Sequence, residues 1–583
     1  MLVLGIHSGY HDACAALFDD YRMVSAVALE RLTRRKIDGG RVPAESIAEC
    51  LAIAGRTPRE VDAVALGRAA FPSRYYTHLP VGRRLESRAR VMLGKEKHKS
   101  MERECVRYRR ADSERMFDHA AFLADHGFRP GISVRFFNHH LAHALPTLFH
   151  TDWDEALLYT ADGGGDNVQY SLRVFRDGRI ETLYGGDEEL VRPLRIDSLG
   201  LAYGYATQAL GYRINRHEGK LTGLAAHGKP TLLPDLAEHF SVDDAGEIHS
   251  DFESYPAMRR FIFERAQGVP REDVACSVQR LLEQFVLEAV RRLLARHPAR
   301  RLGLAGGVFA NVLLNQRLAE EMPVDEVFVY PAMSDQGLAA GGVLQFLLER
   351  DGLEHWLSRR YRLDHLYYGR DFGAEIDAVL GGDARFAKLA DAPIETAAEL
   401  VHQGRILALF TKGMEYGPRA LGARSILAAP TDPGITGVLN RRLERSEFMP
   451  FAPVVPEEKA AEVFDVNSVN AYACRFMTIT CDVRPAWRER IPAVVHVDGS
   501  ARPQTITRDA NPPYYDVVSA FGRETGTPVL VNTSFNVHEE PIVNTPSECA
   551  KALVDGRIDF VVTQQAIYEA AASRNSVEAG SRL

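Results

Sequence analysis

The sequence FFNHHLAHALPTLF at residues 136–149 contains a closely spaced pair of histidines, His139 and His143. On an α-helix, side chains four residues apart lie on the same face, about one turn from each other. Asn138 is a favourable N-cap for such a helix. Pro146 is expected to end or kink the helix soon afterwards. The segment therefore predicts a short helix that presents two imidazoles on one side.

A second motif, DGGGD at residues 162–166, follows an apolar run at residues 156–159 that predicts a strand. Two histidines and the carboxylate of Asp162 form a suitable ligand set for a divalent metal ion. A simpler interpretation also fits, in which these are polar side chains at a helix start and a strand end, because an isolated HxxxH is short and common.

The composition of the 583-residue chain is that of an ordinary globular protein, with 46% hydrophobic and 25% charged residues. This length predicts about two to four domains. The net charge of -8 and the pI near 6.2 argue against general nucleic-acid binding. We expect no membrane span and no signal peptide. The seven scattered cysteines lack CxxC spacing, which indicates a reducing, cytoplasmic environment and no zinc–thiolate site.

Three short strands are expected at the beginning of the chain, at residues 2–6, 13–18 and 23–29. This opening is typical of a nucleotide-handling α/β domain, in which the polar loop at residues 7–12 lies between the strand ends. His11 in this loop is a candidate general base. The alternative is a loop histidine whose hydrogen bonds are satisfied by the main chain.

Two basic segments follow. Lys36 ends a basic turn that is either solvated or in contact with a phosphate. Residues 68–110 carry many arginines and lysines together with tyrosines, and they interrupt the α/β pattern. A charged face of this kind is either simply solvated or a lid that recognises a polar or anionic substrate.

A strand at residues 302–305 leads into Gly306 and Gly307, and Asn311 follows on an expected helix. A strand, a glycine turn and a helix start can hold a phosphate or nucleotide, although glycine pairs alone are common. Lys220, in the small-residue run GKLTGLAAHG, is a candidate phosphate contact.

Asp335 follows another expected strand, at residues 327–330, and can complete a metal or substrate site. Residues 356–370 then break the pattern and predict a linker. A new alternation of helices and strands begins at Ile376.

Arginines recur in the second half of the chain in rigid, small-residue or proline-bounded settings. Arg419, Arg424, Arg445 and Arg502 suggest guanidinium groups that converge on an oxyanion. Taken singly, each arginine fits a structural salt bridge equally well.

Five motifs occur in a fixed order along the chain: HHLAH, GKLTGLAAHG, GGVFAN, GPRALGARSIL and VNTSFN. Together they resemble the NodU/CmcH carbamoyltransferase family, which makes carbamate esters on nodulation factors and antibiotics. The resemblance implies an α/β fold with an N-terminal duplicated actin-like (ASKHA, TsaD-like) metal domain at residues 1–357. It also implies an insertion at about 68–128 and a C-terminal YrdC-like α/β domain at residues 358–583.

The resemblance assigns roles to particular residues. The metal ligands are His139, His143, Asp162 and Asp335, with iron(II) as the usual ion and other divalent metals as alternatives, and His140 lies behind them. The catalytic histidine is His11. The residues that bind nucleotide or carbamoyl adenylate are Lys36, Gly164, Lys220, Gly306, Gly307 and Asn311. The residues that bind carbamoyl phosphate are Arg419, Arg445, Arg502, Asn532 and Ser534.

The chain departs from its relatives at three places. Some antibiotic-type members have an acidic residue two positions before the catalytic histidine, where this chain has Gly9. Residues 444–449 replace a Lys-x-Arg-Glu segment, with Arg445 able to take the cationic role and Met449 in place of the last arginine. Arg216 stands where some members have an aspartate. The acceptor contacts and the exact phosphate ligands are therefore not carried over.

The implied reaction is an ATP-dependent O-carbamoyl transfer in secondary metabolism, such as antibiotic biosynthesis. Carbamoyl phosphate and ATP, with Mg²⁺, give carbamoyl adenylate. Its carbamoyl group then passes to a hydroxyl of a small-molecule natural product while His11 assists proton removal. The expected partners are carbamoyl phosphate, ATP and this acceptor, but neither a membrane nor nucleic acid. The oligomeric state is open, with a homodimer as the commonest option.

Other functions fit fewer of these motifs. A zincin-type metallohydrolase needs glutamate where HHLAH has His140. A sugar kinase or ATPase of the same duplicated type explains GGVFAN and DGGGD, but not GPRALGARSIL or VNTSFN. A tRNA-modifying threonylcarbamoyl-type transferase is disfavoured by the acidic pI. A non-catalytic scaffold leaves the site-like motifs unexplained.

Overall fold

The computed structural model describes the chain in four stretches: residues 1–92, 97–391, 393–445 and 449–571. The chain forms two compact units. The N-terminal unit comprises Met1–Thr33 and Ile37–Leu363, and the C-terminal unit comprises Arg34–Lys36 together with the chain from Asp364 onward. The sequence-based boundary at 357/358 and the structural division at 363/364 both fall in the segment that breaks the α/β pattern.

The first sheet of the N-terminal unit has five strands in the order β3-β2-β1-β4-β7. The first three strands pair antiparallel, whereas β4 runs parallel to β1 and β7 runs parallel to β4. Every residue of the central strands β1 and β4 is buried, as expected for strands covered on both faces. The strands are β1 (Leu2–His7), β2 (Cys14–Asp19), β3 (Arg22–Ala28), β4 (Ala63–Leu66) and β7 (Ser133–Phe136).

The second sheet repeats this arrangement with the order β10-β9-β8-β13-β14. Again the first three strands are antiparallel and the last two are parallel to the central strand. The two halves of the unit therefore share one topology, as a duplicated fold requires. The strands are β8 (Ala156–Gly165), β9 (Val168–Arg176), β10 (Arg179–Tyr184), β13 (Arg301–Ala305) and β14 (Glu326–Val329).

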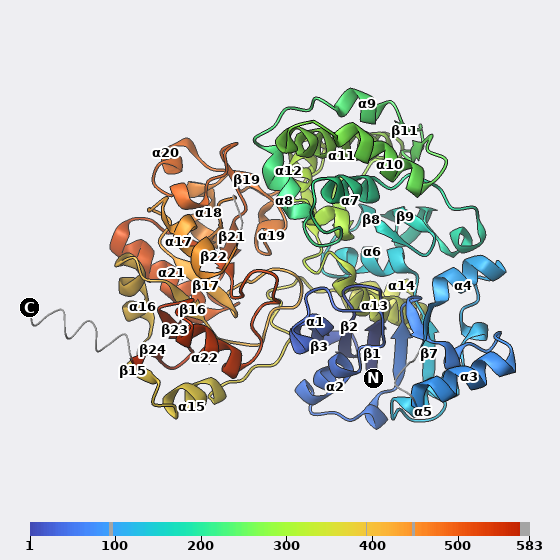
Figure 1. Cartoon of the computed structure of the whole chain (residues 1–583), viewed down its shortest axis with the longest axis horizontal. Coiled ribbons are helices and arrows are strands. Elements are labelled where there is room, and N and C mark those ends of the chain that lie inside the picture. The colour runs from blue at the N-terminus through green and yellow to red at the C-terminus, as the bar shows by residue number, and fades with distance from the viewer. Residues whose placement is uncertain (93–96, 392, 446–448, 572–583) are drawn as a thin grey trace, which may run out of the picture. The chain divides into compact units, whose positions relative to one another are not determined.

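Two helices lie between the sheets of the N-terminal unit (Figure 1). Helix α6 (His139–Phe149) packs on β8 and β13 of the second sheet, and α13 (Leu338–Asp351) packs on β1, β2 and β4 of the first. The two helices also pack on each other. Pro146 lies inside α6, which continues to Phe149, because the buried contacts of the helix offset the loss of one main-chain hydrogen bond.

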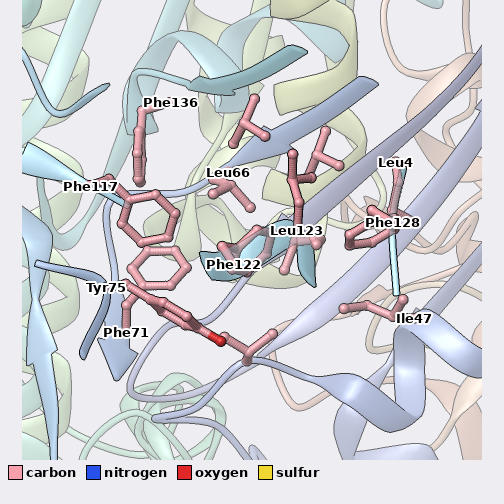
Figure 2. Packing of buried hydrophobic residues seen from close by; sticks show 14 of the residues in the cluster. Leu4, Ile47, Leu66, Phe71, Tyr75, Phe117, Phe122, Leu123, Phe128 and Phe136 are labelled. Atoms are coloured by element: carbon pink, nitrogen blue, oxygen red, sulfur yellow. The ribbon is translucent and has the colours of Figure 1, made fainter. Parts of the chain in front are cut away.

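The insertion at residues 68–128, called the basic insertion below, packs its aromatic side chains into the core of the first half (Figure 2). The Phe71 ring lies edge-on to Phe117 and Phe136, with centroid distances of 5.1 Å and 5.8 Å. The segment is therefore anchored by apolar burial although its charged side chains dominate its composition. Its elements are β5 (Ala70–Pro72), α3 (Val81–Met92), β6 (His98–Ser100), α4 (Met101–Tyr108) and α5 (His119–Asp125).

The second half carries a helical layer around α11 (Arg271–Arg296), which packs on α7, α8, α9 and α12. Helix α11 buries its apolar residues at helical spacing. The remaining elements of this layer are α7 (Leu199–Ala209), α8 (Glu218–Ala225), α9 (Leu233–Ala237), β11 (Phe240–Val242), β12 (Ile248–Ser250), α10 (Tyr255–Ala266) and α12 (Val312–Glu321).

The C-terminal unit is built on an eight-stranded mixed sheet in the order β15-β24-β23-β16-β17-β22-β18-β21. Its core includes residues of α16 (Pro393–His402) and α21 (Pro512–Thr525), which pack on each other. The strands are β15 (Phe386–Ala390), β16 (Leu407–Leu409), β17 (Ser425–Ala428), β18 (Ala452–Pro456), β21 (Gln504–Ile506), β22 (Leu530–Ser534), β23 (Phe560–Val562) and β24 (Ile567–Ala570).

The short segment Arg34–Lys36 is tied into this second unit by Arg34. Its guanidinium donates hydrogen bonds to the carbonyls of Pro541 and Ile542 and lies 3.2 Å from Glu548. Among the described residues, no helix combines the length and apolar character needed to cross a membrane. The fold is mixed α/β throughout.

Candidate functional site

Four side chains from distant parts of the sequence meet in the N-terminal unit: His139, His143, Asp162 and Asp335. One ligand atom from each lies within 4.8 Å of the others. Nε2 of His139 is 2.7 Å and Nε2 of His143 is 3.3 Å from Oδ2 of Asp162. The same nitrogens are 3.8 Å and 3.6 Å from Oδ1 of Asp335.

The duplicated fold brings these four residues together. His139 and His143 begin helix α6, whose N-cap Asn138 accepts a hydrogen bond from Leu141 N as the sequence predicts. Asp162 lies on β8, and Asp335 follows β14. Both halves of the unit therefore contribute, since α6 leaves the first sheet and the two aspartates come from the second.

The chemistry of this cluster suits a divalent metal ion. His143 is 1% exposed, and neither of its ring nitrogens has a hydrogen-bond partner in the part of the chain that the structure describes. Burial disfavours the charged form of His139, but the Asp162 and Asp335 carboxylates outweigh it and raise its pKa to about 10. Two imidazoles and two carboxylates thus concentrate negative potential at a buried point, which a cation would neutralise.

Main-chain groups hold the ligand candidates in place. Asp162 Oδ1 accepts a hydrogen bond from Gly164 N at 2.6 Å, which leaves Oδ2 facing the histidines. Asp166 Oδ2 accepts from His139 N at 2.8 Å. The DGGGD motif therefore supplies one candidate ligand and also fixes the start of the helix that carries two more.

His140 points away from the cluster. Its Nδ1 lies 2.8 Å from Thr160 Oγ1 and its Nε2 lies 3.2 Å from the Val168 carbonyl. Burial lowers the pKa of His140 to about 3, so the ring is neutral. It supports β8 and β9 from behind the cluster.

The end of β1 and the loop after it bring two further histidines, His7 and His11, to this region. Nδ1 of His11 lies 3.3 Å from Asp12 Oδ2, and its side chain is 36% exposed. Burial opposes its charge, but the Asp12 and Asp335 carboxylates raise its pKa to about 9. His7, which the motif comparison did not single out, lies closer, with Nε2 3.3 Å from Asp335 Oδ2. In the sequence, the position of His7 at the end of an expected strand is the feature that could have indicated a functional residue.

The glycine turn after β13 lies beside the cluster. Gly306 adopts a positive φ of 97°. A side chain on Gly307 would approach the Asp162 side chain at 3.8 Å. Asn311 caps α12 by accepting a hydrogen bond from Leu314 N and donates one to Gln279 on α11 at 2.7 Å. The turn and the cluster thus share Asp162 as a neighbour.

The two lysines assigned to the nucleotide have different positions. Lys220 is buried on α8, and its Nζ lies 5.6 Å from the centre of the Tyr212 ring. Lys36 belongs to the segment that joins the C-terminal unit. The structure therefore groups Gly164, Gly306 and Gly307 around Asp162, and places Lys36 in the other unit.

The basic insertion reaches the DGGGD motif through two side chains. The buried guanidinium of Arg68 pairs with Asp166 at 2.5 Å and with Asp187 at 3.0 Å. Glu102 on α4 accepts a hydrogen bond from Asn167 N at 3.0 Å. The insertion therefore supports one wall of the cluster.

In the C-terminal unit, β22 places Asn532 and Ser534 on one face, since they are two positions apart. Arg445 donates hydrogen bonds to Ser534 Oγ at 3.0 Å and to Thr533 Oγ1 at 2.6 Å. Asn532 donates to Gln504 Oε1 at 2.7 Å and to the Ala420 carbonyl at 3.1 Å. Residues 446–448 of the departing segment, including Ser446 and Glu447, lie outside the described residues.

Two of the four predicted arginines lie near each other. Burial, and then the charge of Arg502, lower the pKa of Arg419 well below its usual range. The buried Nε of Arg419 has no hydrogen-bond partner among the described residues. An anion between two like-charged guanidinium groups would relieve their repulsion. The nearby His496 has its pKa lowered to about 4 by burial.

Arg424 has a different role from the one that its sequence setting suggested. It is fully buried, its Nη1 donates to the carbonyls of Thr411 and Ala423, and its guanidinium lies 3.7 Å from the centre of the Phe410 ring. Beside it, Glu415 Oε1 accepts hydrogen bonds from three main-chain N–H groups of the loop. Arg424 thus stabilises the loop that carries Arg419.

The two halves of the chain match two family models. Residues 2–344 match the model described as Carbamoyltransferase N-terminus, and residues 398–570 match Carbamoyltransferase C-terminus. Nodulation protein NolNO of Sinorhizobium fredii is 32% identical over 565 residues, which cover 95% of this chain and 78% of that protein. Nodulation protein NolO of Bradyrhizobium diazoefficiens is 34% identical over 440 residues, covering 73% and 77%.

Solved structures give a weaker likeness. Full-length HypF in the phosphate- and nucleotide-bound form has a TM-score of 0.32 and 12% identity, covering 60% of this chain and 56% of that one. A ROK family glucokinase from Streptomyces griseus has a TM-score of 0.28 and 16% identity, covering 59% and 99%. The sequence relationship is the stronger result. It shows that the chain is an enzyme and belongs to the carbamoyltransferase family that includes NolNO and NolO.

Proposed function

We propose that this enzyme is an ATP-dependent O-carbamoyltransferase that acts on a hydroxyl of a small-molecule natural product. The observation that carries the proposal is the buried quartet of His139, His143, Asp162 and Asp335 beside a glycine turn, within a carbamoyltransferase chain. The arginine pair in the C-terminal unit adds a receptive place for a phosphate.

The two units have separate tasks in this proposal. The repeated five-strand order supports an actin-like (ASKHA) nucleotide fold for the N-terminal unit. The C-terminal unit is proposed to be the YrdC-like part that activates the carbamoyl group. There, Arg419, Arg445 and Arg502, with Asn532 and Ser534, would bind carbamoyl phosphate and offset the charge of the leaving group.

The overall reaction balances with one molecule of water. Carbamoyl phosphate, ATP, acceptor hydroxyl and water give the carbamate ester, AMP, pyrophosphate and phosphate. In the first half-reaction, water breaks the bond between the carbamoyl and phosphate groups, which releases phosphate and carbamate. A carbamate oxygen then forms a bond to the α-phosphorus of ATP while the bond from that phosphorus to pyrophosphate breaks, which gives carbamoyl adenylate and pyrophosphate. In the second, the acceptor oxygen forms a bond to the carbamoyl carbon while the bond from that carbon to the AMP oxygen breaks. Keeping the reactive adenylate within one polypeptide limits its hydrolysis.

His139, His143, Asp162 and Asp335 would hold the divalent ion, for which iron(II) is our candidate. When bound, such an ion supplies Lewis-acid polarisation of the carbamoyl oxygen. Gly164, Gly306, Gly307, Asn311 and Lys220 would bind the nucleotide portion, and Lys36 would contact the intermediate. ATP enters as its Mg²⁺ complex.

His11 would accept the proton of the acceptor hydroxyl through Nε2, because its Nδ1 faces Asp12. Without a bound cation, the carboxylates of Asp12, Asp335 and Asp162 raise the pKa of this imidazole to about 9, so the ring is protonated at neutral pH. A cation bound by Asp162 and Asp335 offsets that negative potential and favours the neutral ring that a base requires. The proposed base therefore becomes active only in the loaded site.

The test is a partial-reaction assay of the full chain. With carbamoyl phosphate, ATP and Mg²⁺, we expect exchange of pyrophosphate into ATP that depends on carbamoyl phosphate, and AMP rather than ADP as the product of turnover. His11→Ala should keep the exchange and lose transfer, while the control His239→Ala, at a half-buried histidine paired with Asp251, should keep both. Release of ADP without carbamoyl phosphate would instead support a kinase.

A further inference from the structure

We propose that His7 is a positioning residue of the metal centre, which holds Asp335 by its outer carboxylate oxygen. The proposal rests on the metal centre of the proposed function. It adds a fifth side chain that the motif comparison does not assign. His7 ends β1 of the first sheet, whereas Asp335 follows β14 of the second.

The Asp335 carboxylate has two different neighbours. Its Oδ2 lies 3.3 Å from His7 Nε2. Its Oδ1 lies 3.6 Å from His143 Nε2 and 3.8 Å from His139 Nε2. One oxygen therefore faces the ligand quartet while the other faces His7, which is the arrangement in which an outer partner fixes a ligand carboxylate.

Ordinary packing does not explain the imidazole of His7. The residue is 3% exposed, and within the described part of the chain neither ring nitrogen meets hydrogen-bond geometry, although Nε2 lies 3.3 Å from Asp335 Oδ2. A structural core histidine normally has such partners, because an unsatisfied buried polar group is costly. An imidazole N–H can donate a hydrogen bond to a carboxylate oxygen. Asp335 is the acceptor within reach.

Two glycines make room for this ring. A Cβ atom on Gly9 would lie 2.2 Å from His7 Nε2, and a Cβ atom on Gly67 would lie 2.9 Å from His7 Nδ1. Neither distance is possible for a real side chain, so the imidazole occupies space that any larger residue at position 9 needs. Gly9 is also the position at which the sequence departs from some antibiotic-type relatives. His7 and Gly9 together therefore shape the side of the site next to Asp335, because the His7 ring fills the space that a side chain at position 9 would need.

The position of the hydrogen-bonding atom can be tested with two amide variants. In His7→Gln, the amide nitrogen takes the place of Nε2 and can still reach Asp335. In His7→Asn, the shorter side chain places its nitrogen near the former Nδ1, away from Asp335. Both variants are neutral and polar, so they differ mainly in the contact that the proposal invokes.

The readout is metal binding by the full-length protein, independent of turnover. Co²⁺ would be titrated in competition with a chelator, and its visible absorption spectrum would report the coordination. We expect His7→Asn to weaken Co²⁺ binding by about 10- to 100-fold and to change the spectrum. His7→Gln should stay within a few-fold of the wild type. Gly9→Ala should weaken binding like His7→Asn, whereas Gly82→Ala, where a Cβ meets nothing within 4 Å, should not.

Unchanged Co²⁺ affinity and spectrum in His7→Asn would overturn the inference and leave the proposed function standing. Equal weakening in both amide variants would also overturn it, since that result indicates general disturbance. If the wild type binds no metal, the metal centre and the inference both fall. Normal metal binding with the expected pattern, but no carbamoyl transfer, would retain the role of His7 and reject the proposed reaction.

Discussion

Nε2 of His139 lies 2.7 Å from Oδ2 of Asp162, although the two residues are 23 positions apart. Without a cation, this contact is a charged hydrogen bond that ties α6 to β8. In the proposed metal site, the same two atoms would both be ligands of the cation. The pair therefore links the stability of the fold to the occupancy of the site.

We expect the wild-type chain to bind about one divalent ion, and His143→Ala or Asp335→Asn to lose it, because a partial ligand set cannot offset the cost of dehydrating the ion. Elemental analysis after dialysis against excess metal measures the stoichiometry. His239→Ala is the control, since His239 pairs with Asp251 and belongs neither to the quartet nor to the second group of possible metal ligands, Asp243, Glu247 and His249. Full metal content in both ligand variants would contradict the assignment.

Arg68→Met should destabilise the protein by about 3–5 kcal/mol, because it leaves the buried Asp166 carboxylate without its charged partner. Denaturant unfolding measures the change. Adding Asp166→Asn should recover part of the loss. Arg129→Met, which breaks an exposed pair with Asp62, should cost less than about 1 kcal/mol. Equal losses for the two arginines would show that burial does not matter here.

Arg419→Met should have opposite effects on stability and on activity. It removes the repulsion with Arg502, so the anion-free protein should melt at a higher temperature. It should also abolish the thermal shift that added phosphate gives the wild type, and reduce carbamoyl-phosphate-dependent pyrophosphate exchange by about 10²- to 10³-fold. Arg508→Gln, at an exposed pair with Asp516, is the matched control. A phosphate shift that survives in Arg419→Met would place the anion elsewhere.

Acidification should destabilise the protein in part through His150. Burial lowers the pKa of this histidine to about 3, against about 6.5 in an unfolded chain. The unfolded state therefore binds the proton more readily. The contribution is complete above about pH 6.5 and is lost as the pH falls toward 3.

Between pH 7 and pH 5 this loss is about 2 kcal/mol. His150→Asn keeps an amide near the Tyr361 carbonyl that now lies 3.3 Å from Nδ1, but it cannot take up the proton. Unfolding free energies of both proteins at the two pH values give the difference. An identical pH dependence would show that His150 does not titrate in this range.

Much of the site could be predicted as a set of residues because its parts lie in recognisable motifs in a fixed order. The structure brings His139, His143, Asp162 and Asp335 together, and their role as ligands stays a prediction. His7 could not be found in this way, since its neighbour Asp335 lies far away in the sequence. No local pattern reports a contact between the end of one strand and the loop after another.

Composition does not reveal how the insertion at residues 68–128 is anchored. Its many arginines predict a solvated face or a lid, which stays a prediction, while Phe71 and Phe117 lie in the core of the first half. Charge dominates the average over such a segment, but a few aromatic side chains decide where it packs. Arg424 is the converse case, because its setting resembles that of Arg419 while its Nη1 donates hydrogen bonds to main-chain carbonyls within its own loop. Only the fold distinguishes the two.

The contribution of both sheets to one cluster has a consequence for biogenesis. During synthesis on the ribosome, the histidines of α6 emerge well before Asp335, whose position depends on the completed strand β14. A nascent chain that ends before this strand lacks one of the four proposed ligands. If the quartet binds a metal ion as proposed, the ion would bind late, only after both halves of the N-terminal unit have been made and have packed together.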